Sequence, residues 1–520
     1  MKKWGFGKDI VGFALFFALT ACAKSATFAP YNYGTLNTDP FVQIDKEGYY
    51  REGAYAQLRC ADKGAFDASL SSIYSFGFRR NVLPSVGERY LTVIPVDFSD
   101  APADALAGGE EKAIAQIQEA FFGSSSGNQF VSLAEYYEKT SFHRLHVKGE
   151  VTAKPFRSEE TYAALKAKNN ASQTKAALSR IYSDAITWYN SIPGQSRVLK
   201  HGDPIYFVYL APYAGMDGDT TSRSSMMWAF TINDPAPICW SSYYMMHARD
   251  EDGVDAHTFI HEFGHILGLK DYYDQNSYSE LSSCSPMGRM DMMDCSLGEH
   301  NAFSKMVLDW TRPYIPTGEA TITLRPASGN GDCVLLPLSE YNGTPYDEYL
   351  LLEYYTPTYL NYADARLRDD AGMSLMAGSG IKVYHVDARL GVFDDRAKKP
   401  IAAFTPSTTL GGYSLDFYRD NSGLIYDGTA SSEAGFLIKS IPVSSAALPS
   451  YYIAGDHDQD INYSGVTAHM RDCLFEVGQG IDASFPGLSF HSGRPLSYSF
   501  KVTSITATMA RIAVRPILKN

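Results

Sequence analysis

The sequence predicts an α/β (α+β) fold in the first part of the chain and an all-β region in the last part. Up to about residue 316, apolar β-branched runs alternate with helical patterns, and that order is typical of α/β proteins. From Thr317 onward, short runs such as EYLLLEYY and GIKVYHVD are separated by Gly, Asn, Asp and Ser, which indicates strands joined by turns. At 520 residues the chain is also too long for one core, so we expect several domains.

The elements of the first part follow from apolar periodicity and from residues that start or stop helices. Ser132 and Glu135 have the spacing of a capping box, and Gly123 stops the helix before it. The expected elements are, in order, a strand at Tyr90–Phe98, a helix at Glu110–Phe122, a helix opening at Ser132, a strand at 143–151, a longer helix at 159–190 and a strand at Pro204–Ala211.

Residues 1–22 have the pattern of a bacterial lipoprotein signal peptide. Three lysines precede an apolar run from Ile10 to Leu19 that is too short to span a bilayer. The stretch Leu19–Cys22 resembles a lipobox, which predicts lipidation of Cys22; the alternative is a cysteine placed there by chance. Ala23 is compatible with the outer membrane. We therefore expect an outward-facing protein of the bacterial cell envelope, or an extracellular one, with a lipid as its only contact with the membrane.

The remaining chain divides by composition into three parts. Residues 23–85 are expected to form an extended or propeptide-like segment, 86–316 the domain that carries the motif described next, and 317–520 the β-rich domain. Forty-five basic against 58 acidic side chains give a net charge of −13 without long runs of one sign, which argues against nucleic acid as a partner. Six cysteines remain after Cys22, and proximity suggests only the pair Cys284–Cys295.

The segment 261–274, HEFGHILGLKDYYD, carries the strongest functional motif. His261 and His265 are four residues apart, so on a helix their imidazoles lie on one face. Glu262 stands beside them and can reach a water molecule without binding the metal. This H-E-x-x-H arrangement predicts two histidine ligands to Zn²⁺ and a glutamate general base. Residues 258–267 contain no proline and have apolar residues at helical spacing, which favours the helix.

Asp271 is the expected third metal ligand. Gly268 can adopt the positive φ that ends a helix and turns the chain, and Asp271 stands six residues beyond His265. Asp274 is a competing candidate. Glu280 or Glu299 would serve in a different zincin layout.

The chain resembles the immune inhibitor A family of secreted bacterial zinc metallopeptidases, which are metzincin-like. The resemblance covers roughly residues 86–390 and rests on LTVIPVDFSD, SLAEYYEKTSFHRLHVKGEV, HEFGHILGLKDYYD, MDMMD, AFSKMVLDW and GIKVYHVDARL. It implies a zincin catalytic domain with zinc on His261, His265 and Asp271, and Glu262 as general base and acid. It also implies a methionine turn beneath the metal, with Met293 in the best register as a packing residue.

Two features depart from that resemblance. Cys295 stands two residues after Met293, where some metzincins have an oxyanion-stabilising tyrosine, so that role is unassigned. His300, Tyr272 and Tyr273 are candidate substitutes, but a packing or surface role is favoured for each. In addition, the segment before the helix lacks an obvious partner for a substrate peptide. Ser225–Ile232 is the candidate edge strand for binding substrate by main-chain hydrogen bonds, with an ordinary inner strand as the alternative.

Several smaller signals complete the prediction. His257 is one turn before His261, too far to share its ion, so we expect a supporting role. Asp456, Asp458 and Asp460 alternate as in a calcium loop but lack its glycine and glutamate, so a solvated loop competes with a Ca²⁺ site. Cys60 is a candidate zinc ligand in a latent form of the protein, but pairing in a disulfide is favoured.

The function that the sequence predicts is zinc-dependent endopeptidase activity on protein or peptide substrates. The alternative is a non-catalytic surface lipoprotein, an adhesin or binding module that uses a zincin scaffold.

Overall fold

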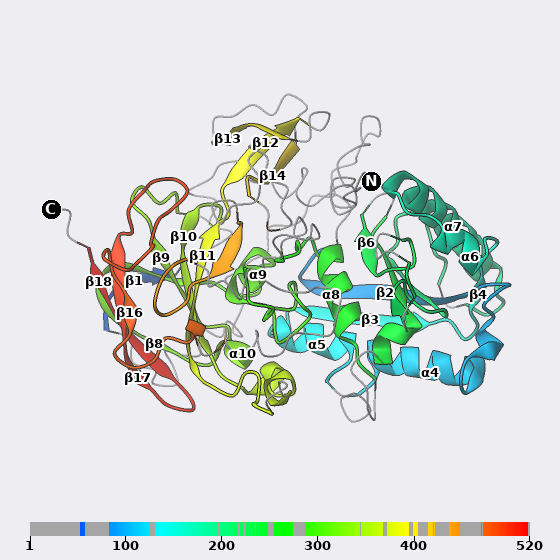
Figure 1. The fold of residues 1–520 in the computed structure, drawn as a ribbon, viewed down its shortest axis with the longest axis horizontal. Helices are drawn as coiled ribbons and strands as arrows, with labels where there is room; N and C mark the ends of the chain where they lie inside the picture. Colours follow the sequence, from blue (N-terminus) through cyan, green and yellow to red (C-terminus); the bar gives the residue numbers. More distant parts are fainter. Residues whose placement is uncertain are drawn as a thin grey trace.

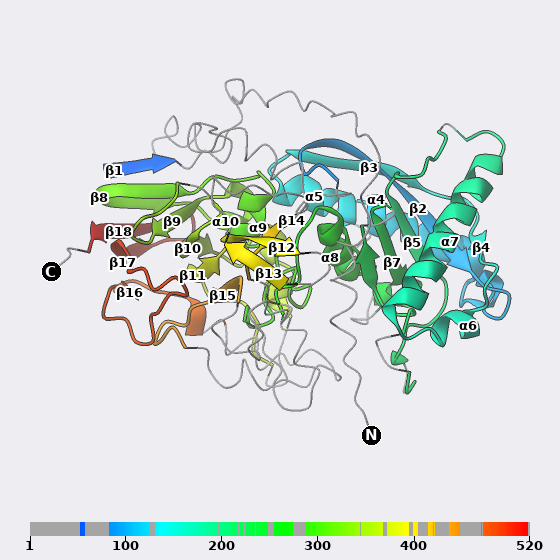
Figure 2. The ribbon, with the colours of Figure 1, turned by 90° about the horizontal axis from the view of Figure 1, so that it is seen from above.

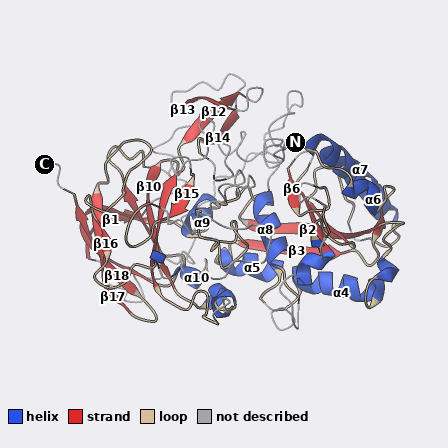
Figure 3. Ribbon diagram, in the orientation of Figure 1, coloured by secondary structure: helices blue, strands red, loops and turns tan. Residues whose placement is uncertain are grey.

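The chain forms a mixed α/β structure in which two large sheets lie at opposite ends, with helices α8 and α9 between them (Figure 1, Figure 3). This confirms the expected α/β class. The structure is a computed structural model, and the residues that it describes are 52–57, 83–124, 130–195, 197–216, 219–221, 225–233, 236–247, 254–273, 286–343, 345–367, 372–394, 399–403, 414–419, 421, 436–447, 470 and 472–517.

The first sheet has six strands among the described residues, in the order β3-β2-β5-β7-β6 with β4 beside β2. Most pairs are parallel, but β6 runs antiparallel to β7 at the edge. Parallel strands are usually covered on both faces, and β5 is buried along its whole length. The strands are β2 (Gly87–Asp97), β3 (Leu145–Val151), β4 (Phe156–Arg157), β5 (Ile205–Tyr209), β6 (Phe230–Ile232) and β7 (Ile238–Ser242).

Helices cover both faces of this sheet. The α7 residues Leu178 and Tyr182 pack against Ile94 and Phe207 on one face. Helices α4, α5 and α8 contribute to the core on the other face. The helices of this half are α4 (Gly109–Phe122), α5 (Leu133–Thr140), α6 (Tyr162–Lys166), α7 (Ala171–Ser191), α8 (His257–Ile266) and α9 (Ala302–Val307), with 3₁₀ turns η4 (Ala103–Ala105) and η6 (Tyr243–His247).

Local signals explain where these helices begin. Ser132 caps α5 as expected, because its side chain accepts a hydrogen bond from Glu135 N. The single helix expected at 159–190 is wrong, because the chain forms α6 and α7 separately. Asn170 caps α7 by accepting from Gln173 N, and an N-cap residue has an extended backbone that interrupts a continuous helix.

The second large sheet has nine strands among the described residues and forms most of the β-rich half. Figure 2 shows β1 beside β8 at its margin. That half also contains short helical turns: α10 (Ala327–Asn330), η8 (Tyr359–Asn361) and η9 (Asp364–Arg366). The strands are β1 (Glu52–Gln57), β8 (Tyr314–Leu324), β9 (Cys333–Pro337), β10 (Glu348–Tyr355), β11 (Gly380–Asp387), β15 (Ile438–Ser440), β16 (Gly480–Ile481), β17 (Tyr498–Ile505) and β18 (Ala510–Pro516); a separate small sheet contains β12 (Leu390–Asp394), β13 (Lys399–Ala403) and β14 (Ser414–Phe417).

One hydrophobic cluster extends across the two halves. It includes Leu91 and Tyr206 from the first sheet, Phe259 from α8, and Leu351 and Tyr384 from the second sheet. Residues on both sides of the expected boundary at 316/317 therefore share a core, and β1 joins a segment before residue 86 to the β-rich half. Among the described residues, no helix combines the length and apolar character needed to cross a bilayer.

Candidate metal centre

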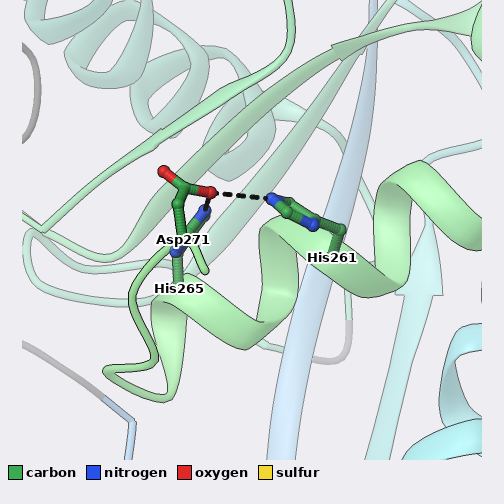
Figure 4. A group of neighbouring side chains, drawn as sticks. All are labelled: His261, His265 and Asp271. Atoms are coloured by element: carbon green, nitrogen blue, oxygen red, sulfur yellow. Dashed lines mark hydrogen bonds and ion pairs between the residues drawn. The ribbon is translucent and has the colours of Figure 1, made fainter. Parts of the chain in front are cut away.

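Helix α8 presents the two histidines of the motif on one face. Phe259, Phe263 and Ile266 are fully buried and fix the rotation of the helix about its axis. The imidazoles of His261 and His265 lie one turn apart, with ring centroids separated by 5.0 Å. The expected helix at 258–267 is thus present, and both side chains point to the same side of it (Figure 4).

The chain after α8 returns a carboxylate to the histidines. Gly268 has φ +96°, and the N–H group of Leu269 donates to the Gly264 carbonyl at 3.0 Å, which closes the end of the helix. After this turn, Oδ1 of Asp271 lies 3.1 Å from Nε2 of His261 and 3.2 Å from Nε2 of His265 (Figure 4). The structure therefore brings together the three residues expected as ligands.

Backbone carbonyls orient the two imidazoles. Nδ1 of His261 donates to the Met292 carbonyl at 2.7 Å, and Nδ1 of His265 donates to the Leu269 carbonyl at 2.8 Å. A carbonyl oxygen can only accept, so each Nδ1 carries a hydrogen and each Nε2 faces Asp271. Carbonyl partners of this kind are the usual second contacts of metal-binding histidines.

The donor set fits a zinc ion. In a tetrahedral site with bonds of roughly 2.0–2.2 Å, neighbouring ligand atoms are roughly 3.3–3.6 Å apart. The two distances from Asp271 Oδ1, 3.1 and 3.2 Å, are slightly shorter than that edge length. Two imidazoles and one carboxylate are also the ligand types of catalytic zinc sites, in which a further position stays open.

The charges of the three side chains are coupled. Burial lowers the pKa of His265, but the Asp271 carboxylate outweighs burial and raises that pKa to about 9. Burial raises the pKa of Asp271, but the imidazoles of His265 and His261 outweigh it and hold the pKa well below its usual range. Both shifts favour a charged His265 imidazole beside a charged Asp271 carboxylate, whereas a metal ion needs the neutral imidazole, so metal binding is coupled to proton release.

Glu262 lies beside the histidines as a buried carboxyl group, 6% exposed. Burial raises its pKa, and the imidazoles of His265 and His261 oppose that rise. Thr231 belongs to the edge strand β6, and its hydroxyl group donates to Glu262 Oε2 at a distance of 2.8 Å. The motif alone did not predict this contact, because the two residues are 31 positions apart.

Met293 lies directly against α8. A Cβ atom built at Gly264 would come within 2.6 Å of Met293 Sδ, so the glycine is what allows the close approach. Met293 is fully buried, and its carbonyl accepts from Tyr272 N at 2.8 Å. The turn that contains Met292 and Met293 thus contacts His261 through one carbonyl and the chain next to Asp271 through the other.

The other residues considered from the sequence lie in different surroundings. Glu299 is held by Lys305 at 2.7 Å and by Thr140 at 2.9 Å, and does not belong to the metal cluster. Aromatic rings surround His300, and the Tyr272 hydroxyl contacts Ser304 at 2.7 Å. Tyr273 is half-buried and Cys295 is partly buried.

His257 stands at the first position of α8 between two carboxylates. Its Nδ1 lies 2.5 Å from Asp255 Oδ1, and its Nε2 lies 3.1 Å from Asp364 Oδ2. Asp364 belongs to η9 in the β-rich half, so His257 joins the start of the helix to that half.

The strand expected at Ser225–Ile232 is shorter than predicted. Only Phe230–Ile232 form β6, and Met226 and Met227 are buried in the core before it. The position at the edge of the sheet is as expected. The remaining predictions concern residues outside the described part of the chain: Cys22, Cys60, Asp274, Glu280, Cys284, Asp456, Asp458 and Asp460.

A second group of possible metal-binding atoms lies in the β-rich half, on Glu348, His385 and His491. Its surroundings suit a cation less well. Asp387 beside it is bonded by Arg389 at 2.7 Å and by Arg419 at 3.2 Å. Arg389 Nη2 also lies 3.9 Å from Glu348 Oε2, so two guanidinium groups already neutralise the two carboxylates. We interpret this group as a buried ionic network.

Comparisons of the chain with protein-family models and with curated proteins found no match. The functional interpretation therefore depends on the motif and on the geometry of the site.

Proposed function

We propose that the chain is a zinc-dependent endopeptidase that hydrolyses peptide bonds in extracellular proteins. The observation that carries the proposal is the convergence of His261 Nε2, His265 Nε2 and Asp271 Oδ1 next to the buried carboxyl group of Glu262. Two imidazoles, one carboxylate and a neighbouring general base are the parts that metal-dependent peptide hydrolysis needs.

Each residue of the site has a distinct role in this proposal. A bound zinc ion would supply a Lewis acid for water and for the scissile carbonyl group. His261, His265 and Asp271 would hold it, with the histidines oriented by the Met292 and Leu269 carbonyls. Glu262 would accept a proton from the attacking water on its carboxylate and pass it to the leaving amine. Its raised pKa supports that role, because a base works best with a pKa near the working pH.

The substrate is proposed to bind along β6. This strand is at the end of the sheet order, and its residue Thr231 contacts the general base. An extended peptide can add to such an edge by main-chain hydrogen bonds. Binding there would bring a peptide bond close to Glu262.

We further infer a metzincin-like catalytic domain related to the immune inhibitor A family. The turn at Gly268, the carboxylate of Asp271 and the packing of Met293 under α8 support this inference. Lipidation at Cys22 and a location on the outside of a bacterial cell are proposed from the sequence of residues 1–22.

A non-catalytic surface lipoprotein built on the same scaffold is the second candidate. It would have no need for a buried carboxyl group beside the histidines, and an unused buried carboxyl group would only destabilise the fold. The presence of Glu262, with its contact to Thr231, therefore favours the enzyme.

The test is cleavage of denatured casein by purified residues 22–520 with Cys22→Ser, with and without chelator. Cleavage that is lost with chelator and restored by zinc is the expected result. A chain that holds one zinc ion yet cleaves no casein or other unfolded protein would favour the scaffold.

A further inference from the structure

The residue before Asp271 is held by the β-rich half. Nζ of Lys270 lies 2.9 Å from Oδ2 of Asp416, and each of these side chains is only 13% exposed. The Lys270 ammonium group also lies 6.0 Å from the centre of the Phe417 ring. Asp416 and Phe417 belong to β14. Because both partners are largely shielded from water, this ion pair is screened less than a surface pair.

The residue after Asp271 is held by the same region. Nδ2 of Asn421 donates to the Tyr272 carbonyl at 2.7 Å and to the Ile438 carbonyl at 2.7 Å. Its Oδ1 accepts from Ile438 N at 3.0 Å. Asn421 is fully buried, and its amide uses both hydrogens and its oxygen in these contacts.

Through these contacts, the β-rich half holds the two residues next to Asp271. Within the half that contains Asp271, Tyr272 N donates to the Met293 carbonyl, and the Tyr272 hydroxyl contacts Ser304. Asp416 and Asn421 fix the two neighbours of Asp271 from a segment about 146 to 149 residues later in the chain. The carboxylate that meets the histidines thus lies in a loop that is fixed on both sides.

We propose that Asp416 and Asn421 are positioning residues for the metal centre, so that the β-rich half completes the site by fixing the third ligand. This inference rests on the proposed zinc site. Neither residue touches His261, His265 or the carboxylate of Asp271 in the contacts above; both act through Lys270 and Tyr272. Loss of a contact that holds a ligand side chain typically weakens metal binding about 10- to 100-fold. Because Asp416 and Asn421 act one residue away from the ligand, we expect the lower end of that range.

The experiment measures the zinc dissociation constant of the full chain by competition with a chromogenic chelator. The variants are Asp416→Asn, which removes the charge that pairs with Lys270, and Asn421→Ala, which removes the contact with the Tyr272 carbonyl. Each has a control of the same residue type in the first half. Asp219→Asn removes the charge that pairs with Lys166 at 2.7 Å. Asn190→Ala removes a side-chain amide whose nitrogen donates to the Leu199 carbonyl and whose oxygen accepts from Leu199 N.

Zinc binding about tenfold weaker in Asp416→Asn and in Asn421→Ala, with both controls and Asp416→Glu close to the parent, is the expected result. The unfolding temperature of each metal-free variant is measured alongside, to separate loss of fold from loss of metal. Folded variants that bind zinc as tightly as the parent would overturn the inference and leave the zinc site intact. A parent chain that binds no zinc would overturn both the proposed site and the inference.

Discussion

The hydroxyl group of Thr231 on edge strand β6 lies 2.8 Å from Oε2 of Glu262 on helix α8. The same hydroxyl group is 2.9 Å from the Glu262 carbonyl oxygen, so Thr231 contacts both the side chain and the backbone of this residue. The proposed substrate edge and the proposed general base are therefore connected by one side chain.

Replacing Thr231 by valine keeps the shape of the side chain and removes the hydrogen bond. A hydrogen bond to a charged group contributes about 1.5–3 kcal/mol, so we expect the rate of peptide cleavage to fall about tenfold or more. Zinc content should be unchanged, and Thr231→Ser should restore most of the rate. A valine variant that cleaves peptide as fast as the parent would show that the contact does not orient Glu262.

Gly264→Ala tests the packing of Met293 under the helix. The added Cβ would lie 2.6 Å from Met293 Sδ in a fully buried place, so the side chain must shift within the core. Overpacking of this kind destabilises proteins by about 1–3 kcal/mol. Thermal unfolding of the metal-free chain should show the loss of stability. Gly264→Ala should cost less stability in a chain that already carries Met293→Ala than in the parent chain. An alanine variant as stable as the parent would contradict the close approach.

Asp271→Asn keeps the size of the side chain and removes its charge. We expect zinc affinity to fall by more than the roughly 10–100-fold that loss of an outer contact causes, because a ligand itself is altered. Chelator competition measures the effect, with Asn190→Ala as a control that alters no residue near the site. Unchanged affinity would favour the competing ligand Asp274.

The ionic network around Asp387 predicts the behaviour of the protein in acid. Burial raises the pKa of Asp387, but Arg389 and His491 outweigh it and hold the pKa well below its usual range. Because the folded value lies below the unfolded value of about 3.9, the carboxylate stabilises the fold above that pH, and this stabilisation is lost as the pH falls below it.

Asp387→Asn should therefore lower stability at pH 7 by about 1.5–3 kcal/mol, since it removes the buried carboxylate that accepts hydrogen bonds from the partly buried Arg389 and Arg419. It should also flatten the dependence of stability on pH below about 4. Denaturant unfolding at a series of pH values measures both effects, with the exposed Asp184→Asn as control. A variant that keeps the steep acid dependence of the parent would assign that dependence to other carboxyl groups.

The sequence predicted those parts of the structure that depend on local patterns. Helix α8, the turn at Gly268 and the capping box at Ser132 follow from periodicity and from single residue types, and each is present. The helix expected at 159–190 failed because Asn170 serves as an N-cap, which a pattern of apolar residues does not reveal.

The contacts that support the site could not be predicted in this way. Thr231 with Glu262, and Asn421 with Tyr272, join residues that are 31 and 149 positions apart. Nothing in the residue types marks these pairs, because threonine and asparagine occur throughout the chain in ordinary polar roles. Only the folded backbone brings them together. For the same reason, the common core of the two halves was not expected from a change in composition near residue 317.

The most direct test of the account is Glu262→Gln, which retains the shape of the side chain and removes its ability to accept a proton. Zinc content and casein cleavage are measured on the same preparations of parent and variant. The account predicts one zinc ion per chain in both, with cleavage by the variant lower by about 10²–10⁴-fold. A glutamine variant that cleaves casein at the parent rate would contradict the assignment of Glu262 as the general base.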